Sequence, residues 1–150
     1  MPFTTNHILV PHDFSEAADH ALDYAIELAS KLGAQISVLH VFQLSAYSSP
    51  TSELARGMER DLSKELAEVL AKHPVPAAYR DSLRMTPVLR TGVPYVEVVE
   101  GAKELGANLI VMGTTGKTGL EHFLLGSVAE RIVRSAECPV VTIKPPPKKR

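Results

Sequence analysis

The chain has 150 residues, of which 45% are hydrophobic and 22% charged, and its 16 basic and 17 acidic side chains give a formal net charge of −1. This composition excludes a disordered chain and is enough for one buried core. The balanced charge gives no reason to expect a nucleic acid or an anionic membrane as partner. The basic cluster Lys148–Arg150 follows three prolines, and we interpret residues 144–150 as a solvated tail.

Cysteine usage and the apolar pattern favour a cytoplasmic location. The one cysteine, Cys138, has no partner for an internal disulfide, and we interpret it as a packing residue rather than a redox thiol. No apolar run approaches the roughly 20 residues that span a bilayer. Residues 1–6 lack the basic start and apolar stretch of a signal peptide. We therefore expect a cytoplasmic protein with no membrane partner.

Strand and helix patterns alternate from the amino terminus onward. His7–Val10 predicts a short apolar strand. A helix follows, which Ser15 caps and Gly33 ends. Gln35–Phe42, rich in branched apolar residues, predicts the second strand. A polar stretch then leads to a second helix, whose apolar face extends over residues 54–70.

The alternation continues through the second half of the chain. Met85–Arg90 predicts a third strand, and Pro87 inside it favours a position at a sheet edge. A third helix begins at Pro94 and ends at Gly106. A fourth strand, a last helix and a fifth strand follow: Asn108–Met112, Ser127–Ala136 and Val140–Ile143. Strands separated by helices predict parallel crossovers, and hence one doubly wound α/β domain over residues 1–150 with helices on both faces of its sheet.

Unusual residues follow the first and fourth predicted strands, and ligands of open parallel sheets bind beyond the carboxyl ends of strands. The first strand ends in Pro11-His12-Asp13 and the fourth in Gly113-Thr114-Thr115-Gly116. The second of these loops contains a further glycine, Gly126, just before Ser127 begins a helix. Glycines allow close backbone approach to a phosphate, and a helix amino terminus favours an anion. A plain turn with an ordinary helix cap is the alternative interpretation of this loop.

Two better-known phosphate motifs are absent. Gly116-Lys117-Thr118 is similar to the end of a P-loop, but that motif requires a glycine at position 111, where this chain has Val111. No G-x-G-x-x-G pattern follows the first strand, so a dinucleotide fingerprint is also missing. A phosphate loop after the fourth strand, rather than the first, also disfavours a flavin or electron carrier.

The loop and its flanking segments resemble the ATP-binding universal stress proteins. Gly113-x2-Gly116-x9-Gly126-Ser127 matches their G-x2-G-x9-G-[S/T] signature. Ile8–Pro11, Asp13–Ser15, Leu39-His40-Val41, Leu109–Gly113 and Cys138–Val141 are similar to the family as well, whereas His12 stands where the family more often has an apolar or small residue. The resemblance spans about residues 6 to 144 and implies the sheet order 3-2-1-4-5. That order places the first and fourth strands side by side.

The resemblance implies ATP, with Mg²⁺, as the ligand. Asp13 would accept hydrogen bonds from the ribose hydroxyls, and Pro11 would line the same wall. Val41 would meet the adenine through its backbone and Met112 through apolar packing. Lys117 would either neutralise a phosphate or remain a solvated charge. The residues implied to hold the phosphates are Gly113, Gly116, Gly126, Ser127 and Val128.

Two classes of function remain open: a nucleotide-dependent sensor or regulator with an unknown protein partner, and a slow ATP hydrolase. Hydrolysis needs a group that positions water and, usually, metal ligands. Within the glycine loop the candidates are Glu121 and His122. We favour the sensor or regulator over an enzyme. A metal site at His12 and His40 is a further alternative, although we interpret both histidines as hydrogen-bonded structural residues.

The fifth strand predicts a homodimer. Val140–Ile143 has no internal charge or proline, and in the family's sheet order this strand lies at an edge. Natural proteins usually block exposed edges with such residues. Pairing with a second copy across a two-fold axis would satisfy the open backbone groups. The resemblance points the same way, because ATP-binding members commonly dimerise through this strand.

Overall fold

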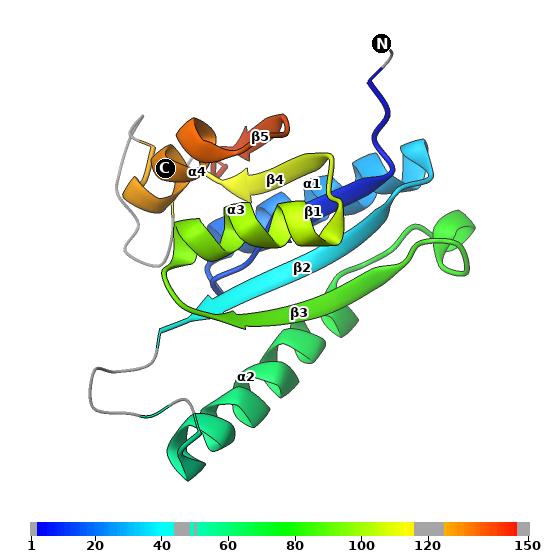
Figure 1. Cartoon of the computed structure of the whole chain (residues 1–150). Helices are drawn as coiled ribbons and strands as arrows, with labels where there is room; N and C mark the ends of the chain where they lie inside the picture. Colours follow the sequence, from blue (N-terminus) through cyan, green and yellow to red (C-terminus); the bar gives the residue numbers. More distant parts are fainter. Residues whose placement is uncertain (1–2, 44–48, 50, 116–124, 147–150) are drawn as a thin grey trace.

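The computed structural model describes residues 3–43, 49, 51–115 and 125–146. They form a five-stranded parallel sheet with helices on both faces and the strand order β3-β2-β1-β4-β5 (Figure 1). The elements are, in chain order, β1 (His7–Pro11), α1 (Glu16–Leu32), β2 (Gln35–Phe42), α2 (Glu53–Lys72), the 3₁₀ turn η1 (Ala77–Tyr79), β3 (Met85–Thr91), α3 (Pro94–Leu105), β4 (Leu109–Gly113), α4 (Ser127–Ser135) and β5 (Val140–Ile143). The predicted fold class and sheet order are confirmed.

Caps and glycines set the helix ends much as the sequence predicted. The Ser15 hydroxyl accepts the Ala18 N–H and begins α1. Gly33 ends that helix in the left-handed conformation, with φ 70°, which a glycine adopts without steric cost. Ser52 caps α2 in the same way as Ser15 caps α1, although the sequence pattern did not distinguish it within the polar stretch.

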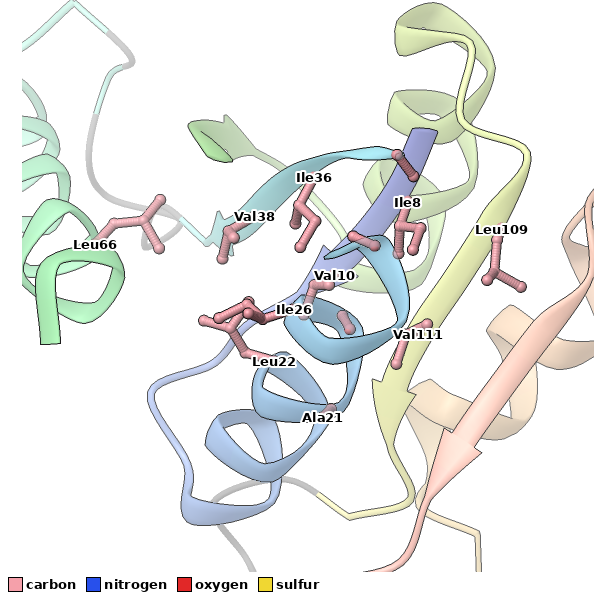
Figure 2. Packing of buried hydrophobic residues seen from close by; sticks show 13 residues of the cluster. Ile8, Val10, Ala21, Leu22, Ile26, Ile36, Val38, Leu66, Leu109 and Val111 are labelled. Atoms are coloured by element: carbon pink, nitrogen blue, oxygen red, sulfur yellow. The ribbon is translucent and has the colours of Figure 1, made fainter. Parts of the chain in front are cut away.

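The sheet separates two apolar clusters, because successive side chains of a strand point to opposite faces. On one face, Ile8 and Val10 of β1 pack with Leu22 and Ile26 of α1 and with Leu66 of α2 (Figure 2). The other face is covered by α3 and α4. Its cluster consists of Leu9, Leu39, Val98, Ala102, Ile110, Met112, Ala129 and Ile132.

The two edge strands, β3 and β5, lie on opposite sides of the sheet (Figure 1). In β3 the backbone groups of even-numbered residues face β2, since Ile36 N–H donates to the Arg84 carbonyl and Gly92 N–H donates to the Phe42 carbonyl. Pro87 therefore has its nitrogen on the outer side, where no ladder bond is lost. The prediction that Pro87 marks an edge is confirmed.

Among the helices of the described residues, none combines the length and the apolar character that crossing a membrane requires. The basic cluster Lys148–Arg150 lies outside the described residues.

Candidate functional site

The carboxyl ends of β1 and β4 lie side by side at the switch point of the parallel sheet. On one side of this point the chain adds β2 and β3, and on the other side it adds β5. The strands β1 and β4 are parallel neighbours, with Ile8 opposite Leu109 and Leu9 opposite Ile110. From β1 the chain passes to α1 on one face and then to β2 on one side. From β4 it passes to α4 on the other face and then to β5 on the opposite side. Such a reversal opens a crevice beyond the strand ends, which is the usual ligand position in this architecture.

Backbone hydrogen bonds at Thr114 join three elements at this crevice. The Thr114 N–H donates to the Ile143 carbonyl at 3.1 Å, and its carbonyl accepts the Gly126 N–H at 2.7 Å. A Cβ at Gly126 would lie 3.2 Å from that same carbonyl oxygen. Gly126 therefore brings the start of α4 closely against the end of β4. Thr114 therefore serves as a hydrogen-bonding residue of the loop after β4.

The amino terminus of α4 lacks the side-chain cap that α1 has. Gly126 is its N-cap residue and Ser127 its first residue, and among the described residues no side chain makes a capping bond there. In contrast, α1 has Ser15, whose hydroxyl accepts the Ala18 N–H, and it has Glu16 and Asp19 in its first turn, whose negative charges offset its dipole. In α4, Glu130 is paired with Arg134 at 2.8 Å. Of the two helices that begin at this crevice, α4 is thus the one suited to accept an anion.

Asp13 lies across from α4, in a tight turn between β1 and α1. Its carboxylate accepts the Ser15 N–H at 3.1 Å and is half-buried. The next residue, Phe14, has φ 64°, a left-handed conformation that is rare for a bulky side chain and costs of order 1–2 kcal/mol. The Phe14 ring stacks on His40 with centroids 4.4 Å apart. The turn thus combines a strained backbone at Phe14 with a carboxylate that is held by the Ser15 N–H at the start of α1.

His12 supports this turn from inside the protein. Its side chain is fully buried; Nδ1 accepts the Phe14 N–H at 3.0 Å, and Nε2 contacts the Asp19 carboxylate at 2.9 Å. An N–H can only donate and a carboxylate can only accept, so the ring is a neutral imidazole with its proton on Nε2. Burial lowers the pKa of His12 below its ordinary value, although hydrogen bonding to Asp19 acts in the opposite direction.

The same bonds argue against a metal site at His12 and His40. Both ring nitrogens of His12 are engaged, and His40 Nδ1 donates to the His12 carbonyl at 2.7 Å. Within the described parts of the chain, no group of three or more histidine, cysteine, aspartate or glutamate side chains is arranged to hold a metal ion. The interpretation of both histidines as structural fits their contacts.

Sequence reasoning missed three residues of this network. Asp19 is the partner of His12, and His73 at the end of α2 lies 3.5 Å from Asp19 and 3.7 Å from Asp23. Phe14 was noted for its resemblance to the family but not for its backbone. An acidic residue in the first turn of a helix is ordinary, and His73 is 54 residues further along the chain, so neither carried a local signal.

The remaining predicted site residues differ in how far they are exposed, and some lie outside the described residues. Pro11 and Val41 are half-buried at the ends of β1 and β2, and Val128 is exposed on the first turn of α4. The Met112 side chain is 3% exposed and belongs to the core beneath α3 and α4. Gly116 and Lys117 lie outside the described residues, as do Glu121 and His122.

Gly113 has a structural role that the sequence did not predict. A Cβ at this position would lie 3.0 Å from the Ala17 carbonyl oxygen and 3.1 Å from the Ala17 Cβ. Gly113 is therefore needed for α1 to begin directly against the end of β4, whatever part its amide takes in binding. Cys138 is half-buried, and burial raises the pKa of its thiol, as suits a packing residue.

Together these features define a class of protein: a doubly wound parallel α/β domain whose switch point lies between the carboxyl ends of β1 and β4. The universal stress protein family model matches residues 4–144. Universal stress protein MJ0531 of Methanocaldococcus jannaschii is 38% identical over 141 residues, which cover 94% of this chain and 83% of the relative. The chain belongs to the universal stress protein family.

Solved structures agree with this assignment. The structure of protein MJ0577 of M. jannaschii is 27% identical, with a TM-score of 0.76 over 97% of this chain and 99% of that one. A universal stress protein from Archaeoglobus fulgidus, solved in complex with dAMP, has a TM-score of 0.61 at 22% identity and covers 95% of this chain and 100% of that one. This second likeness shows the shared fold.

Proposed function

We propose that this chain binds ATP, together with Mg²⁺, in the crevice between β1 and β4. Bound nucleotide would regulate an interaction with a protein partner in the cytoplasm, as part of a stress response. Asp13 would accept hydrogen bonds from the ribose, and the start of α4 would hold the phosphates, with Gly116 and Lys117 contributing from the glycine loop. Val41 and Met112 would contact the adenine, and Pro11 would line the ribose wall.

One observation carries the proposal: the start of α4, which no described side chain caps, and the Asp13 turn follow the carboxyl ends of the neighbouring strands β4 and β1. A nucleotide requires both, because its phosphates are anions and its ribose hydroxyls are donors. Gly126 also holds the start of α4 closely against the end of β4, where its N–H donates to the Thr114 carbonyl. The dAMP complex of the A. fulgidus protein, which has the same fold, supports an adenine nucleotide as the ligand.

Asp13→Ala is expected to weaken ATP binding roughly tenfold or more, because hydrogen bonds to a charged group contribute about 1.5–3 kcal/mol. Gly126→Asp should weaken ATP binding as well, since a carboxylate at the N-cap repels phosphate and competes for the same N–H groups. The added Cβ would require the Thr114 carbonyl to shift by a few tenths of an ångström. Aspartate is also a favourable N-cap residue, which offsets this cost, so α4 should remain folded. Calorimetric titration at neutral pH measures both effects.

Asp61→Ala is the matched control, since it removes an exposed carboxylate of the same charge from α2 and should leave the affinity unchanged. Adenosine, which has no phosphate, separates the two halves of the site. Asp13→Ala should weaken adenosine binding, whereas Gly126→Asp should not. Unchanged ATP affinity in both variants would refute the site. Mass spectrometry of nucleotide released on denaturation would identify the natural ligand.

We also expect turnover far below that of ordinary enzymes, whose kcat values are about 1–1000 per second. Of residues 12–15 and 114–115, which directly follow β1 and β4 in the described chain, only Asp13 is acidic. Glu121 and His122 are the other candidates and lie outside the described residues. A phosphate-release assay with Mg²⁺ measures the rate. Turnover in the enzyme range that Asp13→Ala or a change at Glu121 abolishes would establish the alternative, an ATP hydrolase.

The chain is proposed to form a homodimer through β5. This strand is an edge of the sheet, and its odd-numbered backbone groups face β4, because Ile110 N–H donates to the Pro139 carbonyl and Thr114 N–H to the Ile143 carbonyl. The N–H and C=O groups of Val140 and Thr142 therefore point outward. No charge or proline within β5 blocks them. A second copy related by a two-fold axis would pair with these groups.

A further inference from the structure

We infer that His12 is a positioning residue: in its neutral form it holds the Asp13–Phe14 turn in the binding conformation, and its protonation releases that turn and weakens nucleotide binding. The inference rests on the proposed nucleotide function. It goes beyond that function by naming a residue that touches no ligand and a condition, acid pH, that would control the site.

Three contacts of His12 converge on the turn. Its Nδ1 accepts the Phe14 N–H, its carbonyl accepts a hydrogen bond from His40, and its own N–H donates to the Leu39 carbonyl at 2.8 Å. The contact from Nδ1 is the one that depends on the protonation state of the ring. It is also the one that stabilises Phe14 in its left-handed conformation, next to the residue that presents the carboxylate.

Protonation would place two donors against each other. With a proton on Nδ1, the ring N–H would face the Phe14 N–H over the present 3.0 Å, and the hydrogen bond would become a repulsion. Phe14 would then lose the partner that offsets its unfavourable backbone conformation. Asp13 lies in the same turn, where it accepts the Ser15 N–H, so opening the turn moves the carboxylate away from the crevice.

The groups around His12 determine the direction of the pH effect. Asp19 on α1 and Asp13 in the turn favour a proton on the ring, whereas His73 at the end of α2 opposes it, and His40 on β2 contacts the His12 carbonyl rather than its ring. Burial outweighs the carboxylates, so the pKa of His12 is lowered from its ordinary value near 6.5. The neutral ring therefore predominates at neutral pH, and the loss of affinity is expected on the acid side of that value.

Two substitutions test the roles of the two ring nitrogens of His12 one at a time. In His12→Asn the amide oxygen takes the place of Nδ1 and accepts the Phe14 N–H at every pH. In His12→Gln the amide takes the place of Nε2 and reaches Asp19, and the hydrogen bond from the Phe14 N–H to Nδ1 is lost. At pH 8, His12→Asn should bind ATP about as well as wild type, and His12→Gln roughly two- to tenfold more weakly, as expected for one lost hydrogen bond.

The decisive measurement is the ratio of the ATP dissociation constants of wild type and His12→Asn between pH 8 and pH 5. Titration of ATP itself affects both proteins equally and cancels in the ratio. The ratio should be constant above about pH 6.5 and then rise by up to tenfold per pH unit below the pKa of His12, because only the neutral form binds well. A ratio that stays constant to pH 5 would overturn the inference.

A second measurement does not depend on the stability of any variant. Nitrogen-15 NMR of the imidazole of wild type at pH 8 should show His12 protonated on Nε2 with a bare Nδ1, and a proton on Nδ1 would contradict the assignment. Wild type that binds no ATP at pH 8 would refute the proposed function instead. ATP binding at pH 8 with a constant ratio would leave the function standing and remove only the role of His12.

Discussion

Replacing Gly113 with valine should lower the free energy of unfolding by about 3 kcal/mol, the upper end of the range for overpacked sites. The added Cβ would lie 3.0 Å from the carbonyl oxygen of Ala17, which is buried backbone in the first turn of α1. Backbone within a helix has less freedom to move away than the end of a flexible side chain. Valine has the higher strand propensity, worth up to about 1 kcal/mol, and the steric cost is expected to exceed this gain.

The matched control is Gly57→Ala in α2. A Cβ there meets nothing nearer than the end of the Arg60 side chain at 3.9 Å. Alanine should therefore stabilise the protein by about 0.5–1 kcal/mol, the usual difference between the two residues inside a helix. Urea denaturation of both variants measures the contrast. Wild-type stability in Gly113→Val would show that the contact between α1 and β4 is not what requires a glycine.

Thr142→Pro should convert the proposed dimer to a monomer without unfolding the chain. The Thr142 N–H points away from β4, so proline removes a donor that only a second copy would use. Light scattering after size exclusion should report twice the chain mass of 16.3 kDa for wild type and the single mass for the variant. Thermal unfolding of the variant should remain cooperative, because the bonds between β4 and β5 are retained.

Val141→Pro is the comparison on the same strand. The Val141 N–H faces β4, and its side chain packs against the core beside α1, so this proline should lower stability rather than act only on assembly. Wild type that remains monomeric at micromolar concentration, with or without ATP, would contradict the proposed dimer. The segment after β5, beginning at Pro145, would then be the candidate to cover the edge.

The architecture could be predicted from sequence because its signals are local. Ser15, Gly33 and Gly106 mark helix ends by their own chemistry, and apolar runs mark the strands. The predicted strand limits differ from the observed ones by at most one residue. The turn η1 was missed, because Ala77–Tyr79 has neither periodicity nor a cap.

The candidate site was only partly predictable, because its determinants come from different elements. A glycine in a phosphate-type loop suggests a ligand, yet the contact of Gly113 with Ala17 exists only once α1 is placed on the sheet. The tautomer of His12 follows from the simultaneous positions of Phe14 and Asp19. Neither pattern has a fixed spacing that a sequence could display.

The position of Pro87 limits how many copies can join by strand pairing. At the outer edge of β3 the outward-facing backbone groups belong to odd-numbered residues, and Pro87 leaves a gap in the middle of that row of donors. One edge of the sheet is thus receptive and the other is not. If two copies pair through β5, each copy uses its one receptive edge, and the dimer has no receptive edge left. The chain is thereby protected from open-ended filament growth, in which each added molecule would offer a fresh edge to the next.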